Sequence, residues 1–484
     1  MQKKLLSGLF WILLLNLLIK PFWLLGIETG VQNAVGPDEY GFYFTIFNLA
    51  YIFNILLDLG VTNFNTRNIA RHPRLIDKHL PDVLGIKLAL LLLYAVVTFT
   101  VGLLSGYSSR QFHLLAVLSL NQFLNSLILY LRSNFEGLML FKWDSLISIL
   151  DRLVMIAICA LMLWGPGPDV TVERFAYAQT VAYLLTAATA LAVLAVRIRR
   201  EHNPRFSLRA VRLSRPFAIV ILRKSLPFAL LVLLMASYNR IDPLLLSWLH
   251  PAGDYQAGIY AGAFRLLDAL TMVAYLVSVP LLPVFARMTA DTDPSLDDTT
   301  RMVSGLMAVF SLTAAAVFSL HSHLFMQLLY RSHVEEYAAV FSILVWGIVP
   351  ISMTYVYGTL LTAAGKLRPL NILAAATLVI NIVVNLIAIP RHGAVGSAWA
   401  ALIAQSFMAL AQMRVAYVTL GLKLHVGFLL RLLLFAVVVV AVAVLLPPLP
   451  WWGILLATAA TALAVALPLR LVDLKQIFLI IQQK

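Results

Sequence analysis

The stretch that decides the fold is Phe428–Leu446, FLLRLLLFAVVVVAVAVLL, in which Arg431 is the single charged residue. A helix needs about 20 apolar residues to cross a hydrocarbon core of about 30 Å, and this run has that length. Similar runs recur along the whole chain. Because they are continuous rather than short and alternating, they favour transmembrane helices over barrel strands.

We therefore expect an all-α integral membrane protein with about fourteen transmembrane helices. The expected spans are residues 5–27, 40–62, 83–104, 111–132, 145–164, 173–196, 226–248, 258–285, 302–320, 337–361, 370–389, 396–418, 428–446 and 452–470. The composition agrees, since 61% of the 484 residues are hydrophobic and 12% are charged, with a mean hydropathy of +0.89. A soluble protein has about half apolar and a quarter charged residues, so no sizeable soluble domain is expected.

The distribution of lysine and arginine predicts the orientation. The loops at 63–82 and 197–225 carry four and nine of them, whereas the loops on the other side hold only Arg110, Arg331 and Arg391. Basic loops stay in the cytoplasm, which places both termini inside, in the cytoplasmic (inner) membrane. The basic loop is read as a topology signal that touches anionic lipid, so no nucleic-acid partner is expected.

The start of the chain could mimic a signal peptide, because Lys3 and Lys4 precede an apolar run. No small-x-small cleavage site follows, so an uncleaved first helix is expected. Cys159 is the only cysteine. A disulfide framework and a cysteine metal site are therefore excluded.

Two halves of the chain resemble each other. Gly36–Tyr43 (GPDEYGFY) and Gly253–Tyr260 (GDYQAGIY) each place Gly-x-Tyr at the start of a helix after a polar turn. Six helices per half is an even number, so the halves should share one orientation around a central substrate site. The predicted organisation is an N-terminal lobe at 1–196, a basic linker at 197–225, a C-terminal lobe at 226–418, and two further helices with a tail at 419–484.

Charged residues inside the predicted helices are the candidate site, because a charge in hydrocarbon is expensive and usually faces a cavity or a partner. The candidate cations for an anionic cavity are Lys20, Lys87, Arg152, Arg240 and Arg265. Guanidinium and ammonium groups suit a phosphate, so an anionic, membrane-borne substrate is expected. A purely structural interpretation stays open, in which Lys87 snorkels to the surface, Arg240 pairs with Asp242, and Arg265 pairs with Asp268.

Bending and ion coupling have their own candidates. A proline removes one helix hydrogen bond, so the expected hinges are Pro21, Pro243, Pro280 and Pro283. The candidates for coupling to H⁺ or Na⁺ are Asp58, Asp242, Asp268, Asn381 and Asn385. No cofactor, resident metal or catalytic residue is expected, because the spacing of His321, His323 and His333 matches no recognised ligand pattern.

Several short motifs carry a family resemblance. They are Val35–Tyr43 (VGPDEYGFY), Leu57–Gly60 (LDLG), Arg67–Arg71 (RNIAR), Gly258–Arg265 (GIYAGAFR), Ala364–Lys366 (AGK), Asn381–Asn385 (NIVVN) and Ile389–Gly396 (IPRHGAVG). Together they resemble the polysaccharide and O-antigen flippases of the multidrug/oligosaccharidyl-lipid/polysaccharide exporter superfamily. The resemblance implies transfer of undecaprenyl-pyrophosphate-linked oligosaccharide from the inner to the outer leaflet, driven by an ion gradient. The implied partners are this lipid-linked oligosaccharide, membrane lipids and a polymerase or export machinery, with the protein itself monomeric.

Three other functions fit the sequence less well. A lipid II flippase would be similar in fold, but Lys20-Pro21 stands where that branch has an arginine-aspartate signature. A cation-coupled multidrug exporter would be expected to have an acidic interior. A membrane-embedded glycan polymerase, the enzyme alternative, generally displays its catalytic residues on large extramembrane loops, and the longest outer loop here is only about residues 321–336.

Overall fold

The computed structural model describes residues 19, 21–73, 76–165, 169–201, 215–446 and 449–472. Within these ranges every regular element is a helix and none is a strand. Ten of these helices are long and apolar enough to cross a membrane, or eleven if a bent pair is counted as one span. The predicted class, an all-α multi-pass membrane protein, is confirmed.

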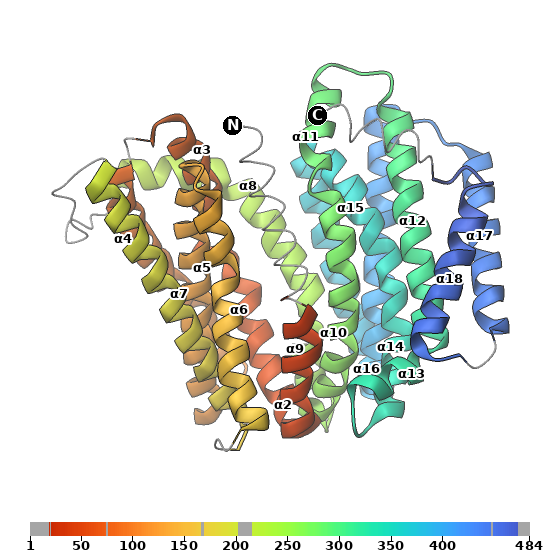
Figure 1. The fold of residues 1–484 in the computed structure, drawn as a ribbon, viewed down its shortest axis with the longest axis horizontal. Coiled ribbons are helices and arrows are strands. Elements are labelled where there is room, and N and C mark those ends of the chain that lie inside the picture. Colours follow the sequence, from red (N-terminus) through yellow and green to blue (C-terminus); the bar gives the residue numbers. More distant parts are fainter. Residues whose placement is uncertain are drawn as a thin grey trace. The chain divides into compact units, whose positions relative to one another are not determined.

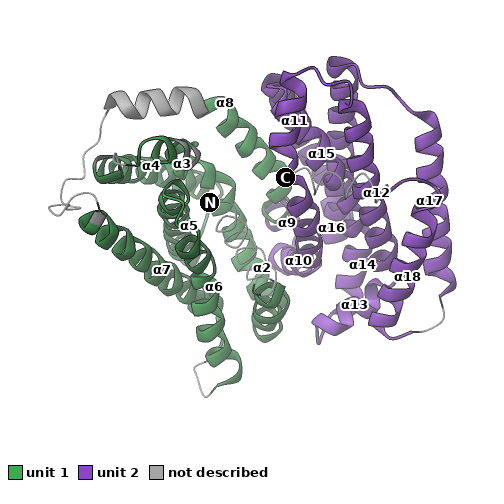
Figure 2. Cartoon of the chain, turned by 45° about the horizontal axis from the view of Figure 1, so that its top comes forward, with its two compact units in different colours: residues 1–244 green, residues 245–484 purple. Residues whose placement is uncertain are grey.

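The chain divides into two compact units, Met1–Leu244 and Leu245–Lys484 (Figure 2). This division differs from the expected lobes, because the helix Arg215–Arg240 belongs to unit 1 rather than to the C-terminal half. The reason is packing, since that helix contacts three consecutive elements of unit 1, Thr29–Ile52, Phe53–Leu57 and Val61–Arg71. Residues 202–214 of the basic linker lie outside the described residues.

Unit 1 is built around one central helix, α5. Its elements are η1 (Trp23–Glu28), α2 (Thr29–Ile52), η2 (Phe53–Leu57), α3 (Val61–Arg71), α4 (Ile76–Leu104), α5 (Ser109–Gly137), α6 (Phe141–Trp164), α7 (Val172–Glu201) and α8 (Arg215–Arg240). Helix α5 packs against α7, α3, α2, α6 and α4 (Figure 1). Its buried residues Tyr130, Leu131 and Phe135 are part of the apolar core of this unit.

Unit 2 contains the remaining helices. They are the greater part of α9 (Asp242–Leu249), then α10 (Gly253–Ser278), α11 (Leu281–Ala290), α12 (Leu296–Leu320), α13 (Ser322–Leu329), α14 (Val334–Leu344), η5 (Val345–Gly347), α15 (Ile348–Ala363), α16 (Leu367–Leu420), α17 (Val426–Leu445) and α18 (Trp451–Ala466). Every expected span from residue 40 onward overlaps one of the helices of the structure. The expected first span, 5–27, lies mostly outside the described residues.

Glycine decides where two of the long helices turn. Gly36 has φ +82° and interrupts α2 just before Pro37. Gly393 has φ +51° and splits α16 into the two expected spans 370–389 and 396–418. A side chain at Gly393 would collide with Gln256, whose Oε1 accepts a hydrogen bond from the amide of Ala394 at 2.8 Å. Glycine alone fits such a position, because it tolerates positive φ and leaves space.

Three of the four expected hinge prolines lie at breaks between helices that the structure describes. The helix pair α8 and α9 is bent by 48°, and Pro243 stands in the first turn of α9. Pro280 lies between α10 and α11, and Pro283 lies in the first turn of α11. Pro21 lies two residues before the short π-helix η1 (Trp23–Glu28). Proline has no amide hydrogen and a fixed φ, so it does not continue the preceding helix and is well suited to the first turn of the next one.

Candidate functional site

Arg152 of α6 is a cation held against aromatic rings inside unit 1. Its guanidinium carbon lies 5.6 Å from the ring centroid of Trp23, and its Nη1 donates to the Tyr183 hydroxyl at 3.3 Å. Asp151 lies 3.6 Å away, and 27% of the Arg152 side chain is exposed. The Trp23 indole is itself fixed, because it donates to Glu28 at 3.1 Å. The Arg152 guanidinium is thus oriented by its neighbours, while part of the side chain remains exposed.

Arg240 shows the same arrangement at the end of α8. Its guanidinium carbon lies 5.1 Å from the ring centroid of Tyr51 on α2. Tyr51 is exposed and its ring is stacked on that of Phe47, with 6.0 Å between centroids. Nearby, the Thr45 hydroxyl donates to the carbonyl of Pro243 at 3.3 Å, which links α2 to the start of α9. A guanidinium over an aromatic face gains about 0.5–2 kcal/mol, depending on its desolvation.

Lys87 of α4 has a different environment. Only 1% of its side chain is exposed. Its ammonium donates to Asp58 Oδ1 at 2.6 Å, to the Leu57 carbonyl at 3.0 Å and to Ser126 Oγ at 2.9 Å. These three acceptors match the three donors of an ammonium. Lys87 therefore neither lines a cavity for a pyrophosphate nor snorkels to the surface, and both expectations for it give way to a buried ion pair.

Arg265 and Lys20 are the other two expected cations. Arg265 lies in α10 of unit 2 and is 4% exposed, with the half-buried Asp268 on the same helix. Lys20 lies outside the described residues. Of the five candidate cations, Arg152 and Arg240 are thus the two that the structure places at partly exposed positions in unit 1.

The candidate residues for ion coupling are mostly buried. Asn381 and Asn385 are fully buried on α16, and the Asn385 amide donates to both the carbonyl and the side-chain oxygen of Asn381 at 3.0 Å. Asp242, at the start of α9, is 1% exposed. Within the described part of the chain, no group of three or more His, Cys, Asp or Glu residues could hold a metal ion.

A polar stripe on α5 was not foreseen from the sequence. Gln122 accepts from Asn54 at 2.6 Å, and Asn121 accepts from Thr180 at 2.7 Å. Further along the helix, Asn65 donates to Ser133 at 2.9 Å and to Asn134 at 3.0 Å. The signal was present, since polar residues recur about every four positions from 121 to 134. These bonds join α5 to the neighbouring elements η2, α3 and α7.

Each unit also ties its helices together at the end predicted to face outward. In unit 1, Arg110 at the start of α5 pairs with Glu39 and Glu173, both at 2.7 Å. In unit 2, the Tyr255 hydroxyl donates to Glu336 at 2.6 Å and lies 2.9 Å from His333. Each cluster joins the start of the Gly-x-Tyr helix of its unit to a later helix.

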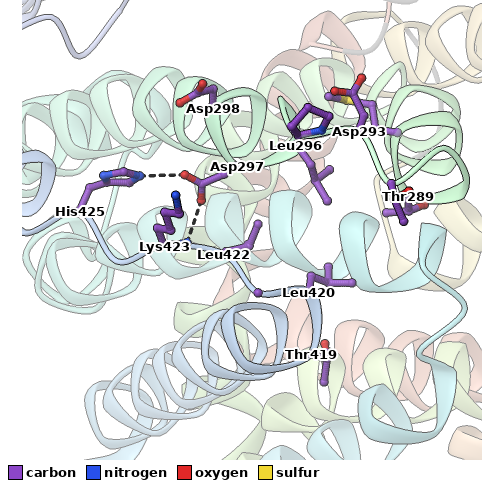
Figure 3. A pocket seen from close by; sticks show the side chains of 14 residues that line it. Thr289, Asp293, Leu296, Asp297, Asp298, Thr419, Leu420, Leu422, Lys423 and His425 are labelled. Carbon is purple, nitrogen blue, oxygen red and sulfur yellow. Dashed lines mark hydrogen bonds and ion pairs between the residues drawn. The ribbon is translucent and has the colours of Figure 1, made fainter.

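A pocket of about 540 Å³ lies in unit 2 between the α11–α12 turn and the α16–α17 turn (Figure 3). Asp297 accepts from the Lys423 amide at 3.0 Å and pairs with His425 at 2.8 Å, which links these two turns. Asp293 and Asp298 also line the pocket. Its carboxylates would repel a phosphate, so we do not assign the anionic substrate to this pocket.

A comparison with known protein families identifies the chain. Residues 5–289 match the family described as "Polysaccharide biosynthesis protein". The chain belongs to this family. The family match covers more than half of the sequence and confirms the resemblance seen in its motifs. A comparison with curated protein sequences finds no match.

Solved structures show which fold this member of the polysaccharide biosynthesis family shares. The lipid II flippase MurJ in an inward closed conformation is 14% identical, with a TM-score of 0.68 over 95% of this chain and 98% of MurJ. An inward-facing multidrug resistance MATE transporter of the MOP superfamily is 15% identical, with a TM-score of 0.64 over 82% of this chain and 94% of that one. The Vibrio cholerae MATE transporter VcmN in its bent form is 15% identical, with a TM-score of 0.55 over 87% of this chain and 97% of VcmN. At such identities the likeness establishes the fold.

Proposed function

We propose that this protein is a flippase that moves a polyprenyl-pyrophosphate-linked oligosaccharide from the inner to the outer leaflet, rather than an enzyme that makes or polymerises it. Its membership of the polysaccharide biosynthesis family and its transporter fold support this proposal. The substrate is the repeat unit of an O-antigen or exopolysaccharide. The protein works in the cytoplasmic membrane with both termini inside, as the distribution of basic loops predicts.

The observation that carries the proposal is the pair of arginines in unit 1, Arg152 and Arg240. Both are partly exposed within membrane-spanning helices, and both stack on aromatic rings, Trp23 and Tyr51. A charged group at this depth is expensive unless it serves a ligand or a partner. An arginine fork binds phosphate through two parallel hydrogen bonds. A pyrophosphate is therefore the ligand that we propose for these two side chains.

In the proposed mechanism, Arg152 and Arg240 bind the pyrophosphate, while the sugar stays in water and the polyprenyl tail stays in lipid. Lys20 and Arg265 are proposed to contribute further positive charge. Lys87 is left out, because its three donors already bind protein oxygens. Bending at the Pro243 and Pro280 breaks would let the site face each leaflet in turn.

Energy for this cycle is proposed to come from an H⁺ or Na⁺ gradient. Asp242, Asn381 and Asn385 are the proposed ion-binding residues, because they place polar oxygens in fully buried positions. A buried carboxylate or amide oxygen is a reasonable ligand for a dehydrated sodium ion, and a buried carboxylate can also accept a proton. Asp268 remains a further proposed member.

The test is a gene deletion complemented with variants. The deletion should abolish surface polysaccharide and cause lipid-linked oligosaccharide to accumulate in the inner leaflet. Wild-type protein and Arg301→Met, a control at an exposed arginine outside the site, should restore export. Arg152→Met and Arg240→Met should not restore it at equal membrane levels. Full export by both variants would remove these residues from the mechanism.

A second candidate function, lipid II transfer, is favoured by the high TM-score and nearly complete coverage of MurJ. Lipid II also carries a polyprenyl pyrophosphate, so the arginine site would serve it equally. The two proposals separate in cells depleted of their own lipid II flippase. Growth rescued by this chain would support lipid II as substrate. Failure of rescue, with surface polysaccharide restored in the deletion strain, would support the polysaccharide repeat unit.

A further inference from the structure

The second helix of unit 1 is broken near the end predicted to face the cytoplasm. It runs as α2 and η2 to Leu57 and resumes as α3 at Val61. Between them, Leu59 has φ +43° and Gly60 has φ +82°. A left-handed conformation costs a residue such as leucine about 1–2 kcal/mol, so the surrounding contacts must hold it.

Side chains from two neighbouring helices hold this break. A helix that ends inside a membrane leaves carbonyl groups without their usual partners. Here the Leu57 carbonyl accepts from Lys87 of α4 at 3.0 Å and from Ser126 of α5 at 3.2 Å. On the other side of the break, Asp58 accepts from the Thr62 amide at 3.2 Å and also from the Thr62 hydroxyl, which caps the start of α3. Lys87 and Asp58 then join at 2.6 Å.

Unit 2 breaks its corresponding helix by a different means. There α10 ends at Ser278 and α11 begins at Leu281, with Pro280 at the junction. Because proline lacks the amide hydrogen, that break is built into the backbone. The break in unit 1 contains no proline. The amides of Asp58 and Leu59 donate to the Ile55 carbonyl and Gly60 supplies a positive φ, while the Lys87–Asp58 pair and Ser126 bind the turn from the neighbouring helices.

The pair is also electrically neutral as a whole. Adding one proton to Asp58 would leave the ammonium of Lys87 alone in a position that is 1% exposed. Breaking a buried pair in this way is strongly unfavourable, since it leaves an uncompensated charge. Because protonation of Asp58 is so unfavourable, the pair is better suited to a constant structural contact than to ion coupling, the role first expected for Asp58.

We propose that Lys87 and Asp58 are positioning residues, which fix the angle between the outer segment of this helix, α2, and its inner segment, α3. The segment that they fix carries Tyr51 about two turns away, roughly 10 Å along the helix. Tyr51 supports Arg240, so the proposal rests on the proposed function of that arginine. The angle itself can be measured without any substrate.

The experiment measures distances between two spin labels in unit 1 by pulsed electron paramagnetic resonance. The labels replace Asp38 on α2 and Ala70 on α3, both exposed, in a Cys159→Ala background, so that their separation reports the angle across the break. Wild type should give a narrow distribution. Lys87→Met and Asp58→Asn should each broaden or shift it. Lys87→Arg, which keeps the charge, should restore the narrow distribution.

A matched control removes another ion pair of the same unit. Arg132 and Asp144 form a two-bond pair, at 2.7 and 3.2 Å, away from the break. The double variant Arg132→Met/Asp144→Asn should keep the wild-type distribution. If the distance distribution broadened equally in this control, the loss of any ion pair would loosen unit 1, and the proposal would be overturned.

Export in complemented cells provides the second readout. Lys87→Met should reduce export at least tenfold at equal protein level, and Lys87→Arg should recover it. Wild-type distributions in Lys87→Met and Asp58→Asn would overturn the proposal. If these two variants do not accumulate, Ser126→Ala decides, because an unchanged distribution in that milder variant would also overturn it. If even wild-type protein exports no glycan, the proposed function fails while the distance measurement still decides the positioning role.

Discussion

Replacement of Arg152 by lysine separates the geometry of the guanidinium from its charge. Lysine keeps the positive charge but loses the planar fork that can bind two phosphate oxygens at once. It also loses the hydrogen bond to Tyr183, now 3.3 Å long, and the contact with Trp23 at 5.6 Å. We therefore expect Arg152→Lys to bind a pyrophosphate more weakly while the protein still folds and reaches the membrane.

The size of the effect follows from the interactions lost. One hydrogen bond to a charged group contributes about 1.5–3 kcal/mol. At about 1.4 kcal/mol per factor of ten, this predicts a loss of roughly 10- to 100-fold in transport for Arg152→Lys. Trp23→Leu keeps Arg152 but removes the cation–π contact, worth about 0.5–1 kcal/mol at a partly exposed site, together with the indole bond to Glu28, and should cost at least about two- to fivefold.

The assay is the initial rate at which labelled lipid-linked oligosaccharide reaches the outer leaflet in complemented deletion cells, normalised to protein in the membrane. The expected order of rates is wild type, Trp23→Leu, Arg152→Lys and then Arg152→Met. A rate for Arg152→Lys equal to wild type would show that only charge matters. A wild-type rate for Arg152→Met would refute the assignment of this residue to the substrate.

Three further outcomes follow from single contacts. Tyr51→Leu should lower export about two- to fivefold without changing protein level, since it removes the ring beneath the α8 guanidinium; a larger loss than that of the arginine variants would contradict this reasoning. Gly365→Ala should lower the free energy of unfolding by about 1–2 kcal/mol, because its φ is +71° with no atom near the new methyl group. Gly427→Ala, equally open but without a positive φ, is the control in the same denaturation experiment. Glu39→Gln should lower the free energy of unfolding by at most about 1 kcal/mol, and by less in high salt, because the Glu39 and Arg110 side chains are 44% and 48% exposed.

The positions of the helices could be predicted because the membrane imposes a simple rule. Each crossing needs a long apolar run with its backbone bonds satisfied inside the run, so the runs themselves indicate the spans. The breaks at Gly36 and Gly393 and the bend near Pro243 were likewise visible as glycine or proline residues. The break at residues 58–60 was not foreseen, although it contains Gly60, because the lysine and serine that bind its Leu57 carbonyl come from other helices.

The sequence by itself determined the class of the protein, its approximate spans and its family, since hydropathy and short motifs are local properties of the chain. It also identified which residues are charged within the membrane, because that needs only composition along a span. Tertiary structure alone decided what each charge does. Arg152 and Arg240 meet aromatic rings from other helices and remain accessible, whereas Lys87 meets a carboxylate, a carbonyl and a hydroxyl in a closed interior. The physical reason is that the cost of a buried charge depends on the partners that surround it, and those partners come from segments distant in sequence.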